Sequence, residues 1–159
     1  MIIFLIVKLN KHSLSFVIKN RIKKILVPLD GSANSIRGLD EAIRIARQSH
    51  ATITGVLVLS APPVLAYQAR LFKGKAFANA RRLMERAKLR AAKNGILFEY
   101  KILGGDPGDI IIRLANSKTS GYNLIVMGHR GISGAKELFL GSVSNYVLHK
   151  SKIPILIVK

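Results

Sequence analysis

The residue types and spacings that point most clearly to chemistry are glycines in the last third of the chain. Residues 128–131 read Gly-His-Arg-Gly, and Gly141-Ser142 follows after nine intervening residues. Glycine has no Cβ, so its backbone can approach an anion closely. A helix that begins at Ser142 would offer unpaired N–H groups and a positive dipole end to the same anion. The spacing therefore predicts a phosphate-binding loop and, with it, a nucleotide or another phosphate ligand.

The elements that must hold this loop can be predicted from their apolar patterns. The loop follows directly on the run Leu124–Met127, which is typical of a buried strand, and residues 142–149 predict a helix at its far end. A second turn, Pro28-Leu29-Asp30-Gly31, follows the apolar run 24–28, which predicts another buried strand. In open parallel sheets, ligands bind at the carboxyl ends of the strands where the strand order reverses. If the two strands are neighbours, both turns face one crevice.

The rest of the chain alternates between strand and helix patterns. Apolar residues at helical spacing predict a helix from Ile36 to Arg47, with Ser32 or Ser35 as its cap. Further strands are expected at 53–59, 96–102, 123–127 and 155–158. Strands and helices thus alternate along the chain, from the first strand to the fifth. This alternation predicts one α/β domain with a mostly parallel sheet that is covered on both faces.

Two intervening helices carry features with competing interpretations. The first is a long basic helix that ends at Asn94-Gly95, and its expected apolar stripe is Phe72, Ala76, Ala80, Leu83, Ala87 and Ala91. Its row Arg81, Arg82 and Arg86 is either a solvated helix face or a nucleic-acid surface. The second begins at Asp106-Pro107, where Asp106 and Asp109 fit a helix cap better than a catalytic pair of carboxylates.

Composition excludes several classes of protein and leaves others open. The chain has no cysteine, so it forms no disulfide and no cysteine-ligated metal site, which fits a reducing compartment. Its four histidines lack metal-ligand spacing, and neither the Walker pattern nor a G-x-G-x-x-G after a strand occurs. We assign no catalytic residue and no metal ligand. The net charge of +18 indicates either an acidic partner or a broadly basic surface.

Residues 1–22 differ from the expected domain at 23–159. The apolar run 2–7 is too short to cross a bilayer, and the lysines follow it rather than precede it, which disfavours a signal peptide. The segment is an extra edge strand or hairpin, a loosely attached tail, or the product of an upstream start codon. A membrane anchor is not favoured, and we expect a cytoplasmic protein.

Several stretches in order resemble the universal stress protein family. They are the run 124–127 with the Gly-x2-Gly-x9-Gly-Ser loop behind it, residues 24–32, residues 104–107, residues 141–144 and residues 154–158. The resemblance implies a flavodoxin-like three-layer sandwich whose five-stranded parallel sheet has the strand order 3-2-1-4-5. It also implies membership of the ATP-binding branch, and usually a homodimer joined through the last strand.

The resemblance further implies which residues hold the nucleotide. The adenine and ribose end would involve the first turn and the main chain near Val58, and the phosphates would meet the glycine loop and the Ser142 hydroxyl. Mg²⁺ or Mn²⁺ would sit on the phosphates rather than in a protein cage. Arg130 either reaches the phosphates or points to solvent, and Lys136 is a candidate phosphate neighbour. The full expected set is Pro28, Asp30, Val58, Gly128, Arg130, Gly131, Gly141, Ser142 and Val143.

Three functions are compatible with these residues. The first is an ATP-binding stress-response regulatory protein, in which nucleotide occupancy switches dimer or partner contacts with little or no hydrolysis. The second is a slow or partner-activated ATPase, in which Asp30 would hold metal or orient water. The third is a basic scaffold that binds nucleic acid or an acidic partner. The complete loop without an evident general base favours the first.

Overall fold

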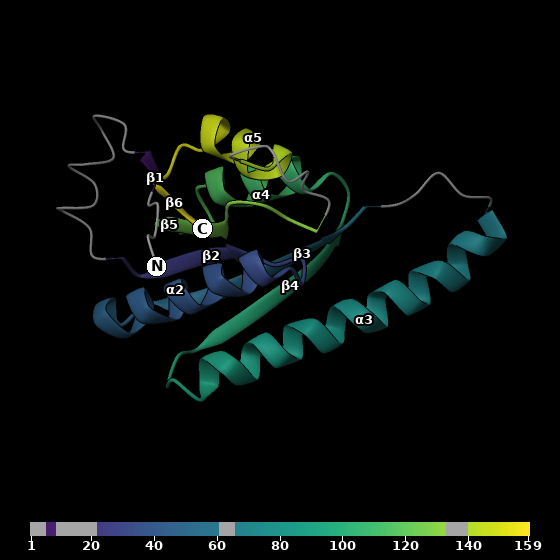
Figure 1. The fold of residues 1–159 in the computed structure, drawn as a ribbon, viewed down its shortest axis with the longest axis horizontal. Helices are drawn as coiled ribbons and strands as arrows, with labels where there is room; N and C mark the ends of the chain where they lie inside the picture. Colours follow the sequence, from purple (N-terminus) through teal and green to yellow (C-terminus); the bar gives the residue numbers. More distant parts are fainter. Residues whose placement is uncertain (1–5, 9–21, 61–65, 133–139) are drawn as a thin grey trace.

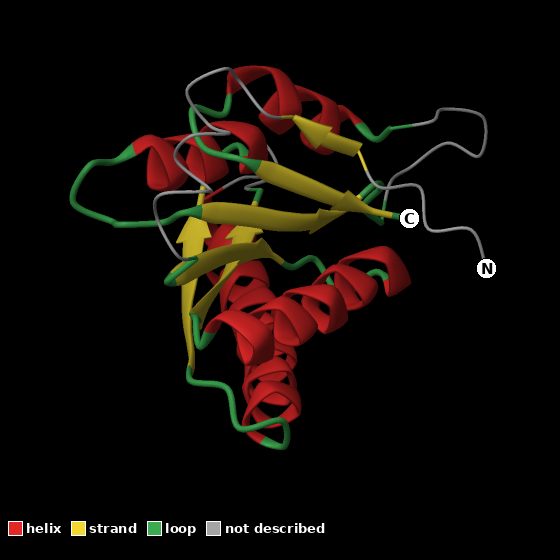
Figure 2. Cartoon of the chain, turned by 90° about the vertical axis from the view of Figure 1, so that its left-hand side faces the viewer, coloured by secondary structure: helices red, strands yellow, loops and turns green. Residues whose placement is uncertain are grey.

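The chain folds around a single six-stranded sheet that separates two layers of helices (Figures 1 and 2). The computed structural model describes residues 6–8, 22–60, 66–132 and 140–159, and for 6–8 and 66–73 it describes the backbone alone. The strand order across the sheet is β1-β6-β5-β2-β3-β4. In chain order the strands are β1 (Ile6–Lys8), β2 (Lys24–Pro28), β3 (Thr52–Leu59), β4 (Phe98–Gly104), β5 (Leu124–Gly128) and β6 (Ile155–Val158).

Strands β2 to β6 are all parallel, and they show the predicted order 3-2-1-4-5. The sixth strand, β1, pairs antiparallel with β6, with Ile6 opposite Ile157. The outer edge of the last strand is therefore covered by the chain's own N-terminal segment. The predicted strand 96–102 is shifted by two residues in the structure. Ile96 is buried in the core, yet pairing starts only at Phe98, opposite Ile53.

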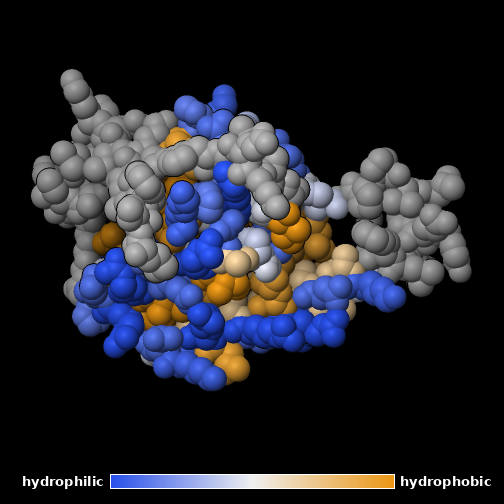
Figure 3. Space-filling model, viewed as in Figure 1, coloured by the Kyte–Doolittle hydropathy of each residue, from blue (hydrophilic) through white to orange (hydrophobic). Residues whose placement is uncertain are grey.

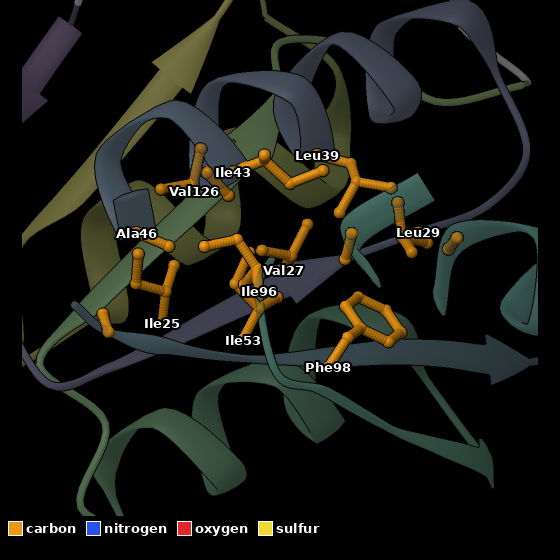
Figure 4. Close-up of a cluster of buried hydrophobic side chains, with 14 of the residues drawn as sticks. Ile25, Val27, Leu29, Leu39, Ile43, Ala46, Ile53, Ile96, Phe98 and Val126 are labelled. Carbon is orange, nitrogen blue, oxygen red and sulfur yellow. The ribbon is translucent and has the colours of Figure 1, made fainter. Parts of the chain in front are cut away.

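Side chains of the central strands alternate between the two helical layers. Ile25 and Val27 of β2 belong to the core cluster under α2 (Ala33–Ser49) and α3 (Ala66–Ala92), which Figure 4 shows. Leu26, between them, belongs to the cluster under α4 (Pro107–Asn116) and α5 (Ser142–Lys150). Both faces of each inner strand are thus apolar, as expected for a parallel sheet covered on both sides.

Two helix starts confirm the predicted caps. The Ser32 side chain accepts a hydrogen bond from the Ser35 N–H at 3.1 Å, so Ser32 is the cap of α2. The Asp106 carboxylate accepts from the Asp109 N–H at 3.0 Å, so the two acids mark the start of α4. Each cap satisfies an N–H that has no partner inside its helix.

Helix α3 packs on β3 and β4 with a stripe that the sequence predicted only in part. Ala80, Ala87 and Ala91 are buried, but the centre of the stripe is Met84, which is fully buried. Leu83 is only partly buried, because the helix turns Met84 rather than Leu83 toward the sheet. The predicted Phe72 lies outside the described side chains. No helix in the described part of the chain is long and apolar enough to cross a membrane.

Candidate functional site

A cavity of about 420 Å³ opens at the carboxyl ends of β2, β3 and β5. From β2 the chain moves outward through β3 to β4, then returns to the other side of β2 as β5. The strand order therefore reverses between β2 and β5, where a parallel sheet leaves a crevice for ligands. The cavity has a size typical of a small-molecule site.

All nine residues predicted for the site line this one cavity. They come from the turn after β2, the end of β3, the loop after β5 and the start of α5: Pro28, Asp30, Val58, Gly128, Arg130, Gly131, Gly141, Ser142 and Val143. Sequence reasoning missed further lining residues, among them Ser35, Val56, Ser60, Pro107, Ile111, Met127, Ile132 and Ser144. Several of these stand beside predicted residues on the same strand end or helix start. Pro107 and Ile111 belong to α4, whose proximity only the fold reveals.

Asp30 joins the two turns that form the cavity. Its Oδ1 accepts from the Ser32 N–H and its Oδ2 accepts from the Ile132 N–H, both at 2.9 Å. The first bond shapes the start of α2, although Ser32 rather than Asp30 is the helix cap. The second spans 102 residues of sequence and holds the loop after β5. Asp30 thus fastens the glycine loop to the turn after β2.

Packing within the protein explains two of the glycines. A Cβ on Gly128 would lie 2.6 Å from the backbone carbon and oxygen of Asn34, so α2 could not approach β5 as it does. A Cβ on Gly131 would lie 2.5 Å from Asp30 Oδ2. Glycine at 128 thus lets α2 pack against the end of β5, and glycine at 131 lets the Asp30 carboxylate approach the loop after β5. The same absence of side chains leaves their backbone open to the cavity.

His129 supports the loop through its backbone while its ring is buried. Its N–H donates to Val158 O at 2.8 Å, and its carbonyl accepts from the Gly141 N–H at 2.8 Å and from Ser144 Oγ at 2.7 Å. Burial lowers the pKa of the His129 imidazole, and the nearby cations Arg130, Arg37 and Lys159 lower it further. A hydrogen bond to the Val158 backbone raises this pKa and so opposes part of the shift. His129 is not among the described residues that line the cavity.

The start of α5 lies at the cavity without a side-chain cap. Gly141 is the N-cap residue and makes no side-chain bond, whereas α2 and α4 have Ser32 and Asp106 there. The first intrahelical bond runs from the Asn145 N–H to Gly141 O, so the N–H groups of the first turn have no acceptor inside the helix. Ser142 is exposed. Backbone N–H groups, a hydroxyl and a positive dipole end thus meet at one point, which suits an anion.

A contact between α4 and α5 shapes the wall of the cavity. The Tyr146 hydroxyl donates to Asp109 Oδ1 at 2.6 Å, and this bond raises the pKa of Tyr146. The Tyr146 ring also closes over Gly108, where an added Cβ would lie 2.7 Å from a ring carbon. The first turn of α4, which includes the lining residue Pro107, is therefore held against α5.

The charged groups around the cavity are few. Asp30 is the only carboxylate and Arg130 the only cation among the described residues that line it. Arg130 is half-buried. No group of three or more His, Asp and Glu side chains suited to a metal lies within the described ranges. Lys136, the other cation predicted for this loop, lies outside the described residues.

Comparison with known proteins places this architecture in a family. The model of the universal stress protein family matches residues 21–159. Universal stress protein YxiE of Bacillus subtilis (strain 168) is 35% identical over 147 residues, which cover 86% of this chain and 98% of that protein.

Solved structures agree with the sequence relatives. Universal stress protein UspA from Lactobacillus plantarum shares the fold with a TM-score of 0.81 at 23% identity, over 88% of this chain and 99% of that one. A universal stress protein in complex with cAMP has a TM-score of 0.67 at 28% identity, over 87% of this chain and 98% of that one. On the family model, the relatives and the shared sheet order, this chain belongs to the universal stress protein family.

Proposed function

We propose that this protein binds ATP in the cavity between β2 and β5 and acts as a stress-response regulator whose nucleotide occupancy switches contacts with partners. The observation that carries the proposal is the convergence of all nine expected residues on one cavity at the topological switch point. A family relative of similar fold has been solved with an adenine nucleotide, cAMP. This relative supports an adenine nucleotide as the ligand, and membership of the ATP-binding branch is part of the proposal.

The phosphates would bind at the uncapped start of α5 and along the glycine loop. Gly141, Ser142 and Val143 line the cavity there, and Arg130 is the one positive side chain among the described lining residues. The adenosine end would lie toward Val58 and Pro28, where the walls are mostly apolar. Mg²⁺ or Mn²⁺ would neutralise charge on the phosphates themselves, since a hard cation prefers oxygen ligands.

The same residues favour binding over hydrolysis. Asp30 is the only carboxylate on the described cavity wall, and each of its oxygens already accepts a backbone N–H. Each oxygen keeps a second lone pair, but the two bonds fix the orientation of the carboxylate, so Asp30 could turn toward an attacking water only by releasing the loop. We therefore expect a turnover far below that of ordinary ATPases. A rate comparable to theirs that Asp30→Asn abolishes, with ATP binding intact, would favour an enzyme instead.

A switch requires a partner surface, and the homodimer through the last strand is one candidate. In this chain β1 lies along the outer edge of β6. Such a dimer would have to form on β1 or displace it. The protein's mass in solution with and without ATP, measured by light scattering, tests whether occupancy changes assembly. The division of the chain at residue 22 and the cytoplasmic location remain predictions.

The decisive experiment starts with protein purified without added nucleotide. Denaturation and chromatography identify any nucleotide that it carries, and calorimetry then measures ATP binding to the stripped protein with and without Mg²⁺. We expect Ser142→Ala to weaken binding about tenfold or more, because one hydrogen bond to a charged phosphate contributes about 1.5–3 kcal/mol and about 1.4 kcal/mol is a factor of ten. Gly131→Val should weaken binding at least as much, because its side chain would occupy space at the loop. Gly104→Val and Ser120→Ala, which lie off the cavity, are the matched controls. Equal affinity in all four variants would reject this site.

A further inference from the structure

Helices α4 and α5 lie together on one side of the sheet, and both begin at the cavity (Figure 1). Pro107 in the first turn of α4 and Ser142 in the first turn of α5 line it. One side-chain bond joins the two beginnings, from the Tyr146 hydroxyl to Asp109 Oδ1 at 2.6 Å. Groups that bind a ligand have to be held in place by a supporting layer of contacts. The bond between Tyr146 and Asp109 is a candidate for that support.

Tyr146 lies on the same face of α5 as Ser142. It follows Ser142 by four residues, and residues four apart are neighbours on the surface of a helix. Its ring also packs on the buried Gly108 of α4, where an added Cβ would lie 2.7 Å from a ring carbon. Gly108 stands next to the lining residue Pro107. The ring and the hydroxyl of Tyr146 therefore fix the beginning of α5 relative to the wall that α4 provides.

A second contact joins the opposite ends of the same two helices. Asn116, the last residue of α4, donates from Nδ2 to Lys150 O at 3.3 Å, and its Oδ1 accepts from the Lys152 N–H at 2.9 Å. Asn116 is not among the described residues that line the cavity. If the Tyr146 contact only held α4 and α5 together, the Asn116 contact would be equivalent to it. The two contacts differ in that only the first lies at the phosphate-binding end of α5.

The contact lies at the solvent-facing side of the helical layer, where it can be changed without opening the core. Tyr146 is 40% exposed, and Asp109 is exposed as well. At the upper edge of Figure 3, where Figure 1 places α5, the described side chains are mainly hydrophilic. The side-chain cap of α4 is Asp106, so the Asp109 carboxylate is not required for capping and is available to Tyr146.

We propose that Tyr146 is a positioning residue of the nucleotide site, whose bond to Asp109 sets the beginning of α5 where its N–H groups and the Ser142 hydroxyl meet the phosphates. This inference rests on the proposed function, because it requires a nucleotide in the cavity. Tyr146 is not among the described lining residues, so it acts through Ser142 and the backbone of α5. Its loss should therefore weaken binding of the phosphates and leave binding of the adenosine end unchanged.

The test compares the affinity of the full chain for ATP, measured by calorimetry at one Mg²⁺ concentration, with that for adenosine, measured by competition. Tyr146→Phe removes the hydroxyl but keeps the ring and the net charge. We expect it to weaken ATP binding about threefold to tenfold, which corresponds to the net contribution of one hydrogen bond, and to change adenosine binding less than about twofold. The matched control is Asn116→Ala, which removes two bonds at the far end of the helix pair and should leave both affinities unchanged.

A pair of variants at Asp109 separates position from charge. Asp109→Asn and Asp109→Ala remove the same negative charge, but only asparagine keeps an oxygen that can accept from the Tyr146 hydroxyl. ATP should therefore bind Asp109→Asn about threefold or more tightly than Asp109→Ala. In the Tyr146→Phe background this difference should vanish, because no hydroxyl remains to be accepted. Thermal unfolding followed by circular dichroism verifies that each variant is folded.

Several results would overturn the positioning role of Tyr146. Unchanged ATP affinity in Tyr146→Phe would reject it while the proposed function stands, whereas a native chain that binds neither ATP nor adenosine would reject both. Equal losses in Tyr146→Phe and Asn116→Ala would mean that the site depends on the helix pair as a whole. Parallel losses of ATP and adenosine would mean a general distortion of the cavity. Equal ATP affinities of the two Asp109 variants would show that the bond itself has no effect on binding.

Discussion

The bond between Asp30 and Ile132 leads to a prediction about how the glycine loop is held. Gly131→Ala introduces a Cβ that would lie 2.5 Å from Asp30 Oδ2. The nearest atom belongs to a side chain, so the carboxylate can rotate away, but its bond to the Ile132 N–H is then lost. Gly131 does not have a positive φ, so alanine meets no backbone strain there. The substitution should therefore act through Asp30 alone.

The magnitude follows from the bonds that each change removes. Asp30→Ala eliminates both carboxylate bonds, to the Ser32 and Ile132 N–H groups. A hydrogen bond to a charged group contributes about 1.5–3 kcal/mol in general, and at an accessible site such as this one water replaces part of that contribution. We therefore expect Asp30→Ala to lower the free energy of unfolding by about 2 kcal/mol. Gly131→Ala removes one bond and should cost about 1 kcal/mol.

A double-mutant cycle provides the assay. Unfolding by urea is followed by circular dichroism for the native chain, both single variants and the double variant. In the Asp30→Ala background there is no carboxylate to displace, so Gly131→Ala should cost less than about 0.3 kcal/mol, which leaves a coupling near 0.7 kcal/mol. Additive losses would refute the reasoning, because they would mean that Gly131 is required by some other contact. Repeating the cycle with ATP separates loop stability from nucleotide affinity.

Other substitutions test single features by urea unfolding. Gly128→Ala should lower the free energy of unfolding by about 1–3 kcal/mol or more, because the backbone of α2 blocks the new Cβ. Gly104→Ala should leave the free energy of unfolding nearly unchanged, because no atom lies nearer than 3.9 Å to its new Cβ. Gly74 is exposed within α3, and a Cβ there would have no atom within 4 Å, so Gly74→Ala should stabilise the protein by about 0.5–1 kcal/mol. Destabilisation by the same amount would mean that residue 74 is not helical. Asp106→Ala should cost about 1 kcal/mol by removing the cap of α4. Burial lowers the pKa of His129, so the unfolded chain takes up a proton more readily. Stability should therefore fall as the pH drops below about 6.5, and His129→Gln should flatten that part of the profile.

Much of the fold could be predicted because its signals are local. Short apolar runs bounded by turn residues, such as 24–28 and 155–158, indicate strands buried on both faces, and the caps Ser32 and Asp106 mark helix starts within a few residues of sequence. Errors arose where a tertiary contact decided the outcome. Met84 rather than Leu83 lies at the centre of the α3 stripe because the helix rotates to fit the sheet.

The candidate site divides in the same way. The spacing of its glycines and serine predicted the loop, because the residues that form a strand-to-helix connection lie close together in the sequence. The spacing held no sign that Asp30 bonds to Ile132, or that Gly128 is pressed against Asn34. Both contacts join segments about a hundred residues apart, and their existence depends on β2 and β5 being neighbours.

The sequence by itself thus determined the family and the alternation of strands and helices, and it predicted which residues would meet a phosphate. Only the tertiary structure decided that those residues surround one cavity and that β1 covers the edge of β6. The physical reason is distance along the chain. Hydrophobic periodicity and capping act over a few residues, whereas a site requires contacts between strands and helices that only the packed core brings together.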